Sequence, residues 1–222
     1  MCSIFGVIGG AGKDLITNSH KMRHRGPDGS GFYSDSEDRF SFLHNRLSFL
    51  DLSSGGAQPI VTDKSAIVFN GEIYNYKDLS DTYFPNENFS GDTRLLQRLI
   101  EKEGIRKALS LVQGMFALVF FDFSNETAYM ARDGHGEKPL FYLQNKTMIY
   151  FGSEVKSLIS YSDKEIDELS LLSYIQYGFV NVGSRTIYKN IKPHYNCFVL
   201  QNIQMYIRHV QVFHFHFRNE PI

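Results

Sequence analysis

The chain opens with Met1-Cys2-Ser3-Ile4-Phe5-Gly6-Val7-Ile8-Gly9, an apolar segment with a cysteine at its second position. Residues 4–8 predict a buried strand that ends at Gly9. Removal of Met1, which a small second residue permits, would leave a thiol and a free α-amine on Cys2. A thiol is a strong nucleophile, and an α-amine with a pKa of about 7.7–8.0 exchanges protons near pH 7. The stretch therefore predicts a candidate nucleophile with its own base, although a lone cysteine is more often a buried core residue.

The composition is that of a globular chain with little net charge. Its 222 residues fit one large domain or a domain with a short extension. Hydrophobic residues make up 42% of the chain and aromatic residues 14%, which is sufficient for a packed core. The formal net charge of -1 gives no electrostatic reason to expect a nucleic acid or an acidic membrane as a partner.

The two cysteines, Cys2 and Cys197, do not predict a disulfide framework and favour a reducing, cytoplasmic compartment. The longest apolar run, residues 115–121, has the length of a strand rather than of a membrane span. The N-terminus lacks a basic segment followed by a long apolar one, so we expect no signal peptide and no lipid anchor at Cys2.

Predicted strands cluster at the start and middle of the chain, with helices between them. Apolar or alternating segments predict strands at residues 31–34, 40–45, 65–69, 115–122, 126–131, 140–143 and 148–152. Helices are predicted at residues 15–24, 92–103, 155–159 and 169–177, of which 92–103 has the clearest apolar stripe and ends before Gly104. Because several strands are apolar on both faces, the pattern predicts an α+β fold with two stacked sheets covered by helices.

A set of motifs occurs in a defined order over about the first 190 residues. The segments are residues 1–6 (MCSIFG), 23–31 (RHRGPDGSG), 46–52 (RLSFLDL), 57–59 (AQP), 69–76 (FNGEIYNY), 90–93 (SGDT), 114–117 (GMFA), 132–133 (RD), 136–140 (GEKPL) and 151–156 (FGSEVK). Together they resemble the class II glutamine amidotransferase domain, an N-terminal-nucleophile hydrolase, and most closely the glutaminase half of asparagine synthetases. The resemblance implies a four-layer αββα sandwich.

The resemblance also implies a reaction, the hydrolysis of the glutamine side-chain amide to glutamate and ammonia through a thioester on Cys2. The side-chain amide of Asn70 and the backbone N–H of Gly71 would form the oxyanion hole. An Asn-Gly pair is also the strongest short signal for a hairpin turn. Residues 73–76 do not form a clean returning strand, however, which favours the oxyanion hole.

The remaining site residues that the resemblance implies would bind the two charged groups of glutamine. Arg46 would bind the carboxylate through its guanidinium, and the backbone of Phe49 and Leu50 would line the site. Glu72 and Asp92 would bind the ammonium group. Asp92 also stands where an N-cap of the 92–103 helix is expected.

No metal and no organic cofactor are predicted for the glutaminase step. His214 and His216 alternate in an aromatic-rich segment, but two histidines without a third ligand do not make a catalytic zinc site. The loop at residues 25–31 would lie near Cys2 as a lid or wall, without a catalytic role.

The resemblance divides the chain into a glutamine amidotransferase domain at residues 1–190 and a divergent tail at 191–222. The Ser-Gly-Gly-x-Asp-Ser pyrophosphate loop of the synthetase half does not occur in this sequence. ATP and magnesium would therefore act only through a synthetase domain that this sequence lacks. We expect a truncated product, a subunit that meets a separate synthetase, or a stand-alone glutaminase.

Two alternatives remain open. A sugar-phosphate or another acceptor for the ammonia is compatible with the 46–52 and 57–59 motifs, whereas the 136–140 and 151–156 motifs favour the asparagine synthetase side. The chain could also be an inactive remnant that only binds or docks. The presence of Cys2, Arg46, Asn70 and Asp92 argues against decay of the site.

Overall fold

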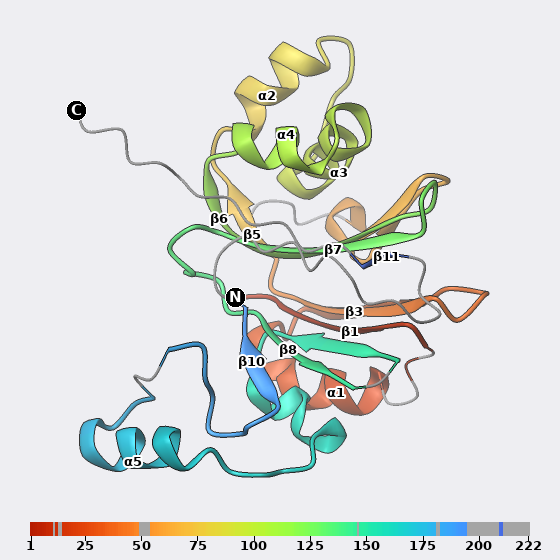
Figure 1. Ribbon diagram of the computed structural model, residues 1–222. Helices are drawn as coiled ribbons and strands as arrows, with labels where there is room; N and C mark the ends of the chain where they lie inside the picture. The colour runs from red at the N-terminus through yellow and green to blue at the C-terminus, as the bar shows by residue number, and fades with distance from the viewer. Residues whose placement is uncertain are drawn as a thin grey trace. The chain divides into compact units, whose positions relative to one another are not determined.

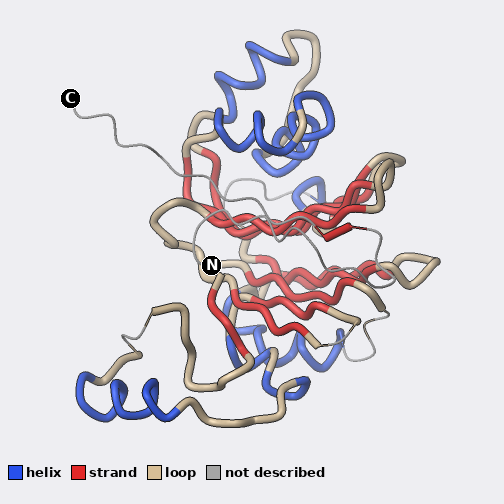
Figure 2. Tube along the Cα trace, viewed as in Figure 1, coloured by secondary structure: helices blue, strands red, loops and turns tan. Residues whose placement is uncertain are grey.

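The protein consists of two compact units, each built on one β-sheet. The computed structural model describes residues 1–10, 12, 15–48, 54–145, 147–180, 183–194 and 209–210. Unit 1 comprises Met1–Leu47 and Pro139–Tyr195, and unit 2 comprises Ser48–Lys138 and Asn196–Ile222. Figure 1 shows the elements of each unit, and Figure 2 distinguishes their helices from their strands.

The sheet of unit 1 has the strand order β10-β8-β9-β1-β3-β2. Its strands are β1 (Ser3–Ile8), β2 (Gly29–Ser34), β3 (Phe40–Arg46), β8 (Phe141–Gln144), β9 (Ile149–Gly152) and β10 (Ile191–Pro193), and all neighbours are antiparallel. The predicted N-terminal strand is confirmed as β1, and all six of its residues are buried. Since β10 pairs with β8, the sheet includes the first residues of the expected tail, while the domain boundary at 190 stays a prediction.

A close approach within this sheet requires the glycine in the middle of β1. A Cβ atom on Gly6 would lie 2.4 Å from the ring of Phe151 and 2.6 Å from the carbonyl oxygen of Ser41. Any larger residue would therefore separate β1 from a neighbouring strand.

The helices of unit 1 agree only in part with the predictions. Helix α1 (Leu15–Met22) passes into a 3-10 turn, η1 (Arg23–Arg25), and α5 (Glu168–Tyr177) matches its predicted segment. The segment predicted to be helical at 155–159 is not one continuous helix, because it forms two short 3-10 helices, η3 (Val155–Ser157) and η4 (Ile159–Tyr161). The hydroxyl of Ser157 donates to the carbonyl oxygen of Glu154 at 2.6 Å, a local bond that competes with helix propagation.

The sheet of unit 2 has the strand order β11-β7-β6-β5-β4. Its strands are β4 (Ile60–Val61), β5 (Ser65–Ile73), β6 (Gly114–Asp122), β7 (Thr127–Arg132) and β11 (His209–Val210). Strands β4 to β7 are antiparallel, and β11 pairs in parallel with β7. The long β5–β6 ladder forms the centre of this unit.

Three helices cover one face of this sheet, as Figure 1 shows: α2 (Tyr76–Tyr83), α3 (Asp92–Glu103) and α4 (Ile105–Leu111). Helix α3 has its predicted bounds, and its apolar stripe is buried in the core with residues of β5 and β6. Helices α2 and α4 were not predicted, because helices of about two turns depend on tertiary packing rather than on a long periodic pattern. None of the helices in the described ranges has the length and apolar character of a membrane span.

Candidate active site

Cys2 lies immediately before β1 and contacts the end of β3. Its Sγ atom accepts a hydrogen bond from the backbone N–H of Leu47 at 3.3 Å, and its thiol donates to the carbonyl oxygen of Leu47 at 3.6 Å. The residue is partly exposed. The thiol is therefore held against backbone and remains accessible to a substrate.

Arg46 is the last residue of β3 and lies in the same unit as Cys2. It pairs with Gly29 in β2, and its carbonyl oxygen accepts from the N–H of Asp28 at 3.0 Å. The β1–β3 ladder, together with the Leu47 contacts, brings the predicted nucleophile and the predicted carboxylate-binding residue to one end of the sheet. Phe49 and Leu50 lie outside the described residues.

Arg25, which no motif in the sequence indicated as a site residue, binds the backbone of Cys2. Its Nε donates to the carbonyl oxygen of Cys2 at 3.1 Å, and its Nη1 donates to Glu154 at 3.2 Å. Glu154 also pairs with His24 and Lys156, at 2.9 Å each. Partial burial raises the pKa of Glu154, but hydrogen bonds from Lys156, His24 and Arg25 outweigh it, so the pKa is lowered. The sequence shows opposite charges at Arg25 and Glu154, in two motifs far apart along the chain. No local spacing predicts that these two residues form a pair.

A buried polar network fixes the strand that carries Arg46. The Oδ1 atom of Asn45 accepts from the hydroxyls of Ser19 in α1 and Ser30 in β2, both at 2.7 Å. Its Nδ2 donates to the carbonyl oxygen of Ser19 at 2.9 Å. The Asn45 side chain is thus bonded at both ends while fully buried, which is the usual state of a structural asparagine.

In unit 2, Asn70 and Gly71 lie within β5 rather than in a turn. They are opposite Ala117 and Phe116 of β6, so the hairpin alternative for this pair is wrong. The side chain of Asn70 is buried, and its Nδ2 group has no hydrogen-bond partner in the part of the chain that the structure describes. A Cβ atom on Gly71 would lie 2.3 Å from the carbonyl oxygen of Met115, so the strand accepts only glycine there.

Asp92 is bonded to the end of β5 and does not cap α3. Its Oδ2 accepts from the N–H of Ile73 at 2.9 Å, and its Oδ1 accepts from the Thr93 hydroxyl at 3.3 Å. The expected N-cap role is wrong, because Gly91 holds that position and α3 begins at Asp92 itself. Burial raises the pKa of Asp92, and the nearby charge of Glu72 adds to this effect. A bound cation would favour the ionised carboxylate.

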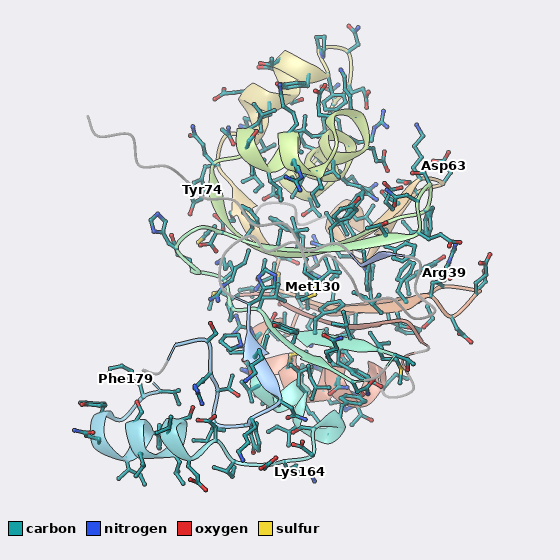
Figure 3. The ribbon with its side chains drawn as sticks, in the orientation of Figure 1. Arg39, Asp63, Tyr74, Met130, Lys164 and Phe179 are labelled. Carbon is teal, nitrogen blue, oxygen red and sulfur yellow. The ribbon has the colours of Figure 1, made fainter. Side chains whose placement is uncertain are left out.

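The surroundings of this end of β5 are acidic. Glu72 is half-buried, and Tyr74, labelled in Figure 3, is exposed just beyond the strand. Desolvation and then the charges of Glu137, Glu72 and Asp133 raise the pKa of Tyr74. Within unit 2, the predicted site residues Asn70, Gly71, Glu72 and Asp92 lie together, where the carboxylates suit a cation and the Asn70 amide is a hydrogen-bond donor. Within unit 1, Cys2 and Arg46 lie together.

Comparison with known proteins identifies the sequences that this chain resembles. A family model described as "Glutamine amidotransferase domain" matches residues 1–208. The chain is 37% identical over 175 residues to asparagine synthetase [glutamine-hydrolyzing] 1 of Bacillus subtilis (strain 168), covering 76% of this chain and 27% of that protein. It is 35% identical over 170 residues to asparagine synthetase B [glutamine-hydrolyzing] of Escherichia coli (strain K12), covering 72% of this chain and 30% of that protein. The chain spans less than a third of the length of these two relatives.

Two solved structures share the fold. One is the glutamine phosphoribosylpyrophosphate amidotransferase from B. subtilis complexed with ADP and GMP, at 20% identity and a TM-score of 0.60. The other is titled as the allosteric regulatory enzyme of purine biosynthesis, at 22% identity and the same TM-score. In both comparisons the matched region is 71% of this chain and 43% of the solved chain. They confirm the predicted fold class, an α+β fold of N-terminal-nucleophile-hydrolase type.

Proposed function

The chain belongs to the glutamine amidotransferase domain family, and we propose that it hydrolyses the side-chain amide of glutamine, as the glutaminase half of a glutamine-hydrolysing asparagine synthetase. The observation that carries this proposal is the buried Nδ2 group of Asn70, a hydrogen-bond donor with no acceptor among the described residues. An unsatisfied buried donor lowers stability. A transient oxyanion on the substrate would supply the missing acceptor.

In the proposed reaction, the Cys2 thiol attacks the amide carbon of glutamine and passes its proton to its own α-amine. The oxygen of the tetrahedral intermediate accepts hydrogen bonds from Nδ2 of Asn70 and the N–H of Gly71. Ammonia leaves with the proton from the amine, and a glutamyl thioester remains on Cys2. Water then attacks the thioester, again with the amine as base, and glutamate leaves as the thiol reforms.

Arg46 would bind the substrate carboxylate, and Glu72 and Asp92 would bind the ammonium group. We also keep the expectation that the backbone of Phe49 and Leu50 lines the site. The buried position and raised pKa of Asp92 support its part, because a substrate cation would favour its ionised form. The step needs no metal or organic cofactor, since Cys2 supplies both the nucleophile and the base.

The ammonia would pass to a synthetase domain or subunit, to which ATP and magnesium belong. The 31–37% identity to proteins named asparagine synthetase supports this choice of acceptor enzyme. We propose a cytoplasmic location, since the chain has only two cysteines and its free Cys2 thiol requires a reducing environment.

Glutamate release from glutamine by the purified chain tests the proposal, with the N-terminal mass measured on the same sample. We expect release from molecules that have lost Met1, none from Cys2→Ala, and unchanged release from Cys197→Ala, which removes the other thiol. Equal release by Cys2→Ala, or no release by folded chains without Met1, would overturn the proposal.

A further inference from the structure

In the described ranges, no strand pairs with one edge of β5 at the candidate oxyanion hole. Along its other edge β5 pairs with β6 from Ser65 to Ile73. Among the described residues β4 pairs only with Ala66 and Ile67, so the open edge begins at Val68. The backbone N–H groups of every second residue point to the same edge of a strand.

Two side chains from outside the sheet occupy this edge. The Oε1 atom of Gln58 accepts from the N–H of Phe69 at 2.7 Å, and Oδ2 of Asp92 accepts from the N–H of Ile73 at 2.9 Å. Both acceptors are more than nine-tenths buried. They replace the hydrogen bonds that a further strand would make, at positions 69 and 73.

Gly71 lies midway between these positions, so its N–H points to the same edge. Its opposite residue in β6, Phe116, is bonded on its far side, because both its N–H and its carbonyl oxygen pair with Asp133. The Phe116 carbonyl oxygen is therefore not the acceptor for Gly71. In the described part of the chain the Gly71 N–H has no acceptor at this edge, and it lies between the N–H groups that Gln58 and Asp92 bind.

The two bracketing side chains are linked through Thr93. Nε2 of Gln58 donates to the Thr93 hydroxyl at 3.4 Å, and this hydroxyl donates to Oδ1 of Asp92 at 3.3 Å. The Gln58 amide thus bonds β5 through its oxygen, and through its nitrogen it bonds the Thr93 hydroxyl that holds Asp92.

We propose that Gln58 is a positioning residue for the oxyanion hole, and that Thr93 positions the carboxylate of Asp92. Gln58 fixes the path of β5 one residue before Asn70, and no acceptor among the described residues competes with the substrate oxygen for the Gly71 N–H. The inference rests on the proposed function, which assigns Asn70 and Gly71 to that hole. It adds separate roles for the two residues. Gln58 stabilises the transition state through the oxyanion hole, and Thr93 supports glutamine binding through Asp92.

Steady-state kinetics separate these two effects. For Gln58→Met, which removes the acceptor, we expect kcat to fall ten- to a hundredfold while KM for glutamine changes less than about threefold. Gln58→Glu keeps an acceptor for Phe69 and should retain a kcat at least fivefold higher than Gln58→Met. For Thr93→Val we expect KM to rise three- to tenfold at unchanged kcat, and Thr93→Ser should restore the wild-type value.

Gln97 provides the matched control. It is another buried glutamine of unit 2, and its Nε2 donates to Ser65 and Ile60, remote from Gly71 along β5. Gln97→Met should lower thermal stability as Gln58→Met does but leave kcat unchanged. An equal loss of kcat in both variants would assign Gln58 to general stability and overturn the proposal.

Amide hydrogen exchange of the full chain tests, without any catalysis, whether the N–H groups of Phe69 and Ile73 are bonded and that of Gly71 is not. The amides of Phe69 and Ile73 should be protected and that of Gly71 should exchange faster. Gln58→Met should speed exchange at Phe69 at least tenfold, and Gln97→Met should not. Equal protection of all three wild-type amides would overturn the inference. If the wild type releases no glutamate, the proposed function fails, and exchange at these amides still decides the geometry.

Discussion

Two buried asparagines, one in β3 of unit 1 and one in β5 of unit 2, differ in how their side chains are hydrogen-bonded. Asn45 in β3 uses both ends of its side-chain amide, in bonds with Ser19 and Ser30. Asn70 in β5 has an Nδ2 group with no partner among the described residues. A satisfied buried amide stabilises the fold, whereas an unsatisfied one is retained at the expense of stability. The difference supports the proposal that the Asn70 side chain receives its hydrogen-bond partner from the substrate.

Among variants that test this comparison, Asn70→Ala should have the largest effect on activity. We expect kcat for glutamine hydrolysis to fall about 10²–10³-fold, the usual effect of removing one oxyanion-hole donor. The free energy of unfolding should change little, because the variant also removes an unsatisfied polar group. Kinetics and denaturant unfolding on the same preparation measure both. A loss of stability that matches the loss of activity would make Asn70 an ordinary structural residue.

The reciprocal variant, Asn45→Ala, should show the opposite pattern. It leaves the hydroxyls of Ser19 and Ser30 without their shared acceptor, so the free energy of unfolding should fall by about 2–3 kcal/mol. The kcat of the molecules that remain folded should stay within a few-fold of wild type. Selective loss of kcat at unchanged stability would remove the distinction between the two asparagines.

The pH dependence of glutamine binding tests whether Asp92 of unit 2 binds the ammonium group of the substrate. Because burial raises the pKa of Asp92, its carboxylate is protonated at a higher pH than that of an ordinary aspartate. As the pH falls through that raised pKa, the ammonium group loses its partner, and KM should rise up to about tenfold. Asp92→Asn should have a high KM that no longer varies over this range. Persistence of the wild-type pH dependence in Asp92→Asn would assign it to another group.

The smallest effect concerns the charged cluster beside Cys2. Since the pKa of Glu154 is lowered, its contribution to stability is present above its ordinary pKa and is lost as the pH falls through the lowered one. Glu154→Gln should lower the free energy of unfolding at pH 7 by less than about 1 kcal/mol and remove that part of the acid dependence. Thermal unfolding against pH measures it.

Glu165, which pairs with Lys189 and is more exposed, is the matched control for this cluster. Glu165→Gln should have no measurable effect on unfolding. Identical acid profiles for wild type and Glu154→Gln would contradict the account of the cluster.

The features that could be predicted from the sequence are those encoded in a continuous stretch. The apolar run of β1 and the stripe of α3 predicted both elements, and the order of the motifs predicted the family. Helices α2 and α4 have only eight and seven residues, too few for a periodic pattern to stand out from the sequence around it. At 155–159, a local hydroxyl bond accompanies two short 3-10 helices in place of one longer helix.

The contacts that organise the candidate site join residues distant in sequence and could not be predicted. Gln58 bonds the N–H of Phe69, eleven residues away, and Arg25 bonds the carbonyl oxygen of Cys2, twenty-three residues away. These are side-chain bonds to backbone groups, and no spacing rule specifies which backbone group is left open. The same reason explains why Asp92 was expected as an N-cap: its acceptor role toward Ile73 depends on where α3 meets β5.

The central claim is that Cys2 is the nucleophile, and covalent capture tests it most directly. The purified chain would be treated with a glutamine analogue that carries an electrophile at the position of the amide carbon, and its peptides would be analysed by mass spectrometry. We predict one adduct, on Cys2 of chains that have lost Met1, which excess glutamine prevents and Asn70→Ala slows. An adduct that forms on Cys197 instead, or on Cys2 regardless of glutamine, would contradict it.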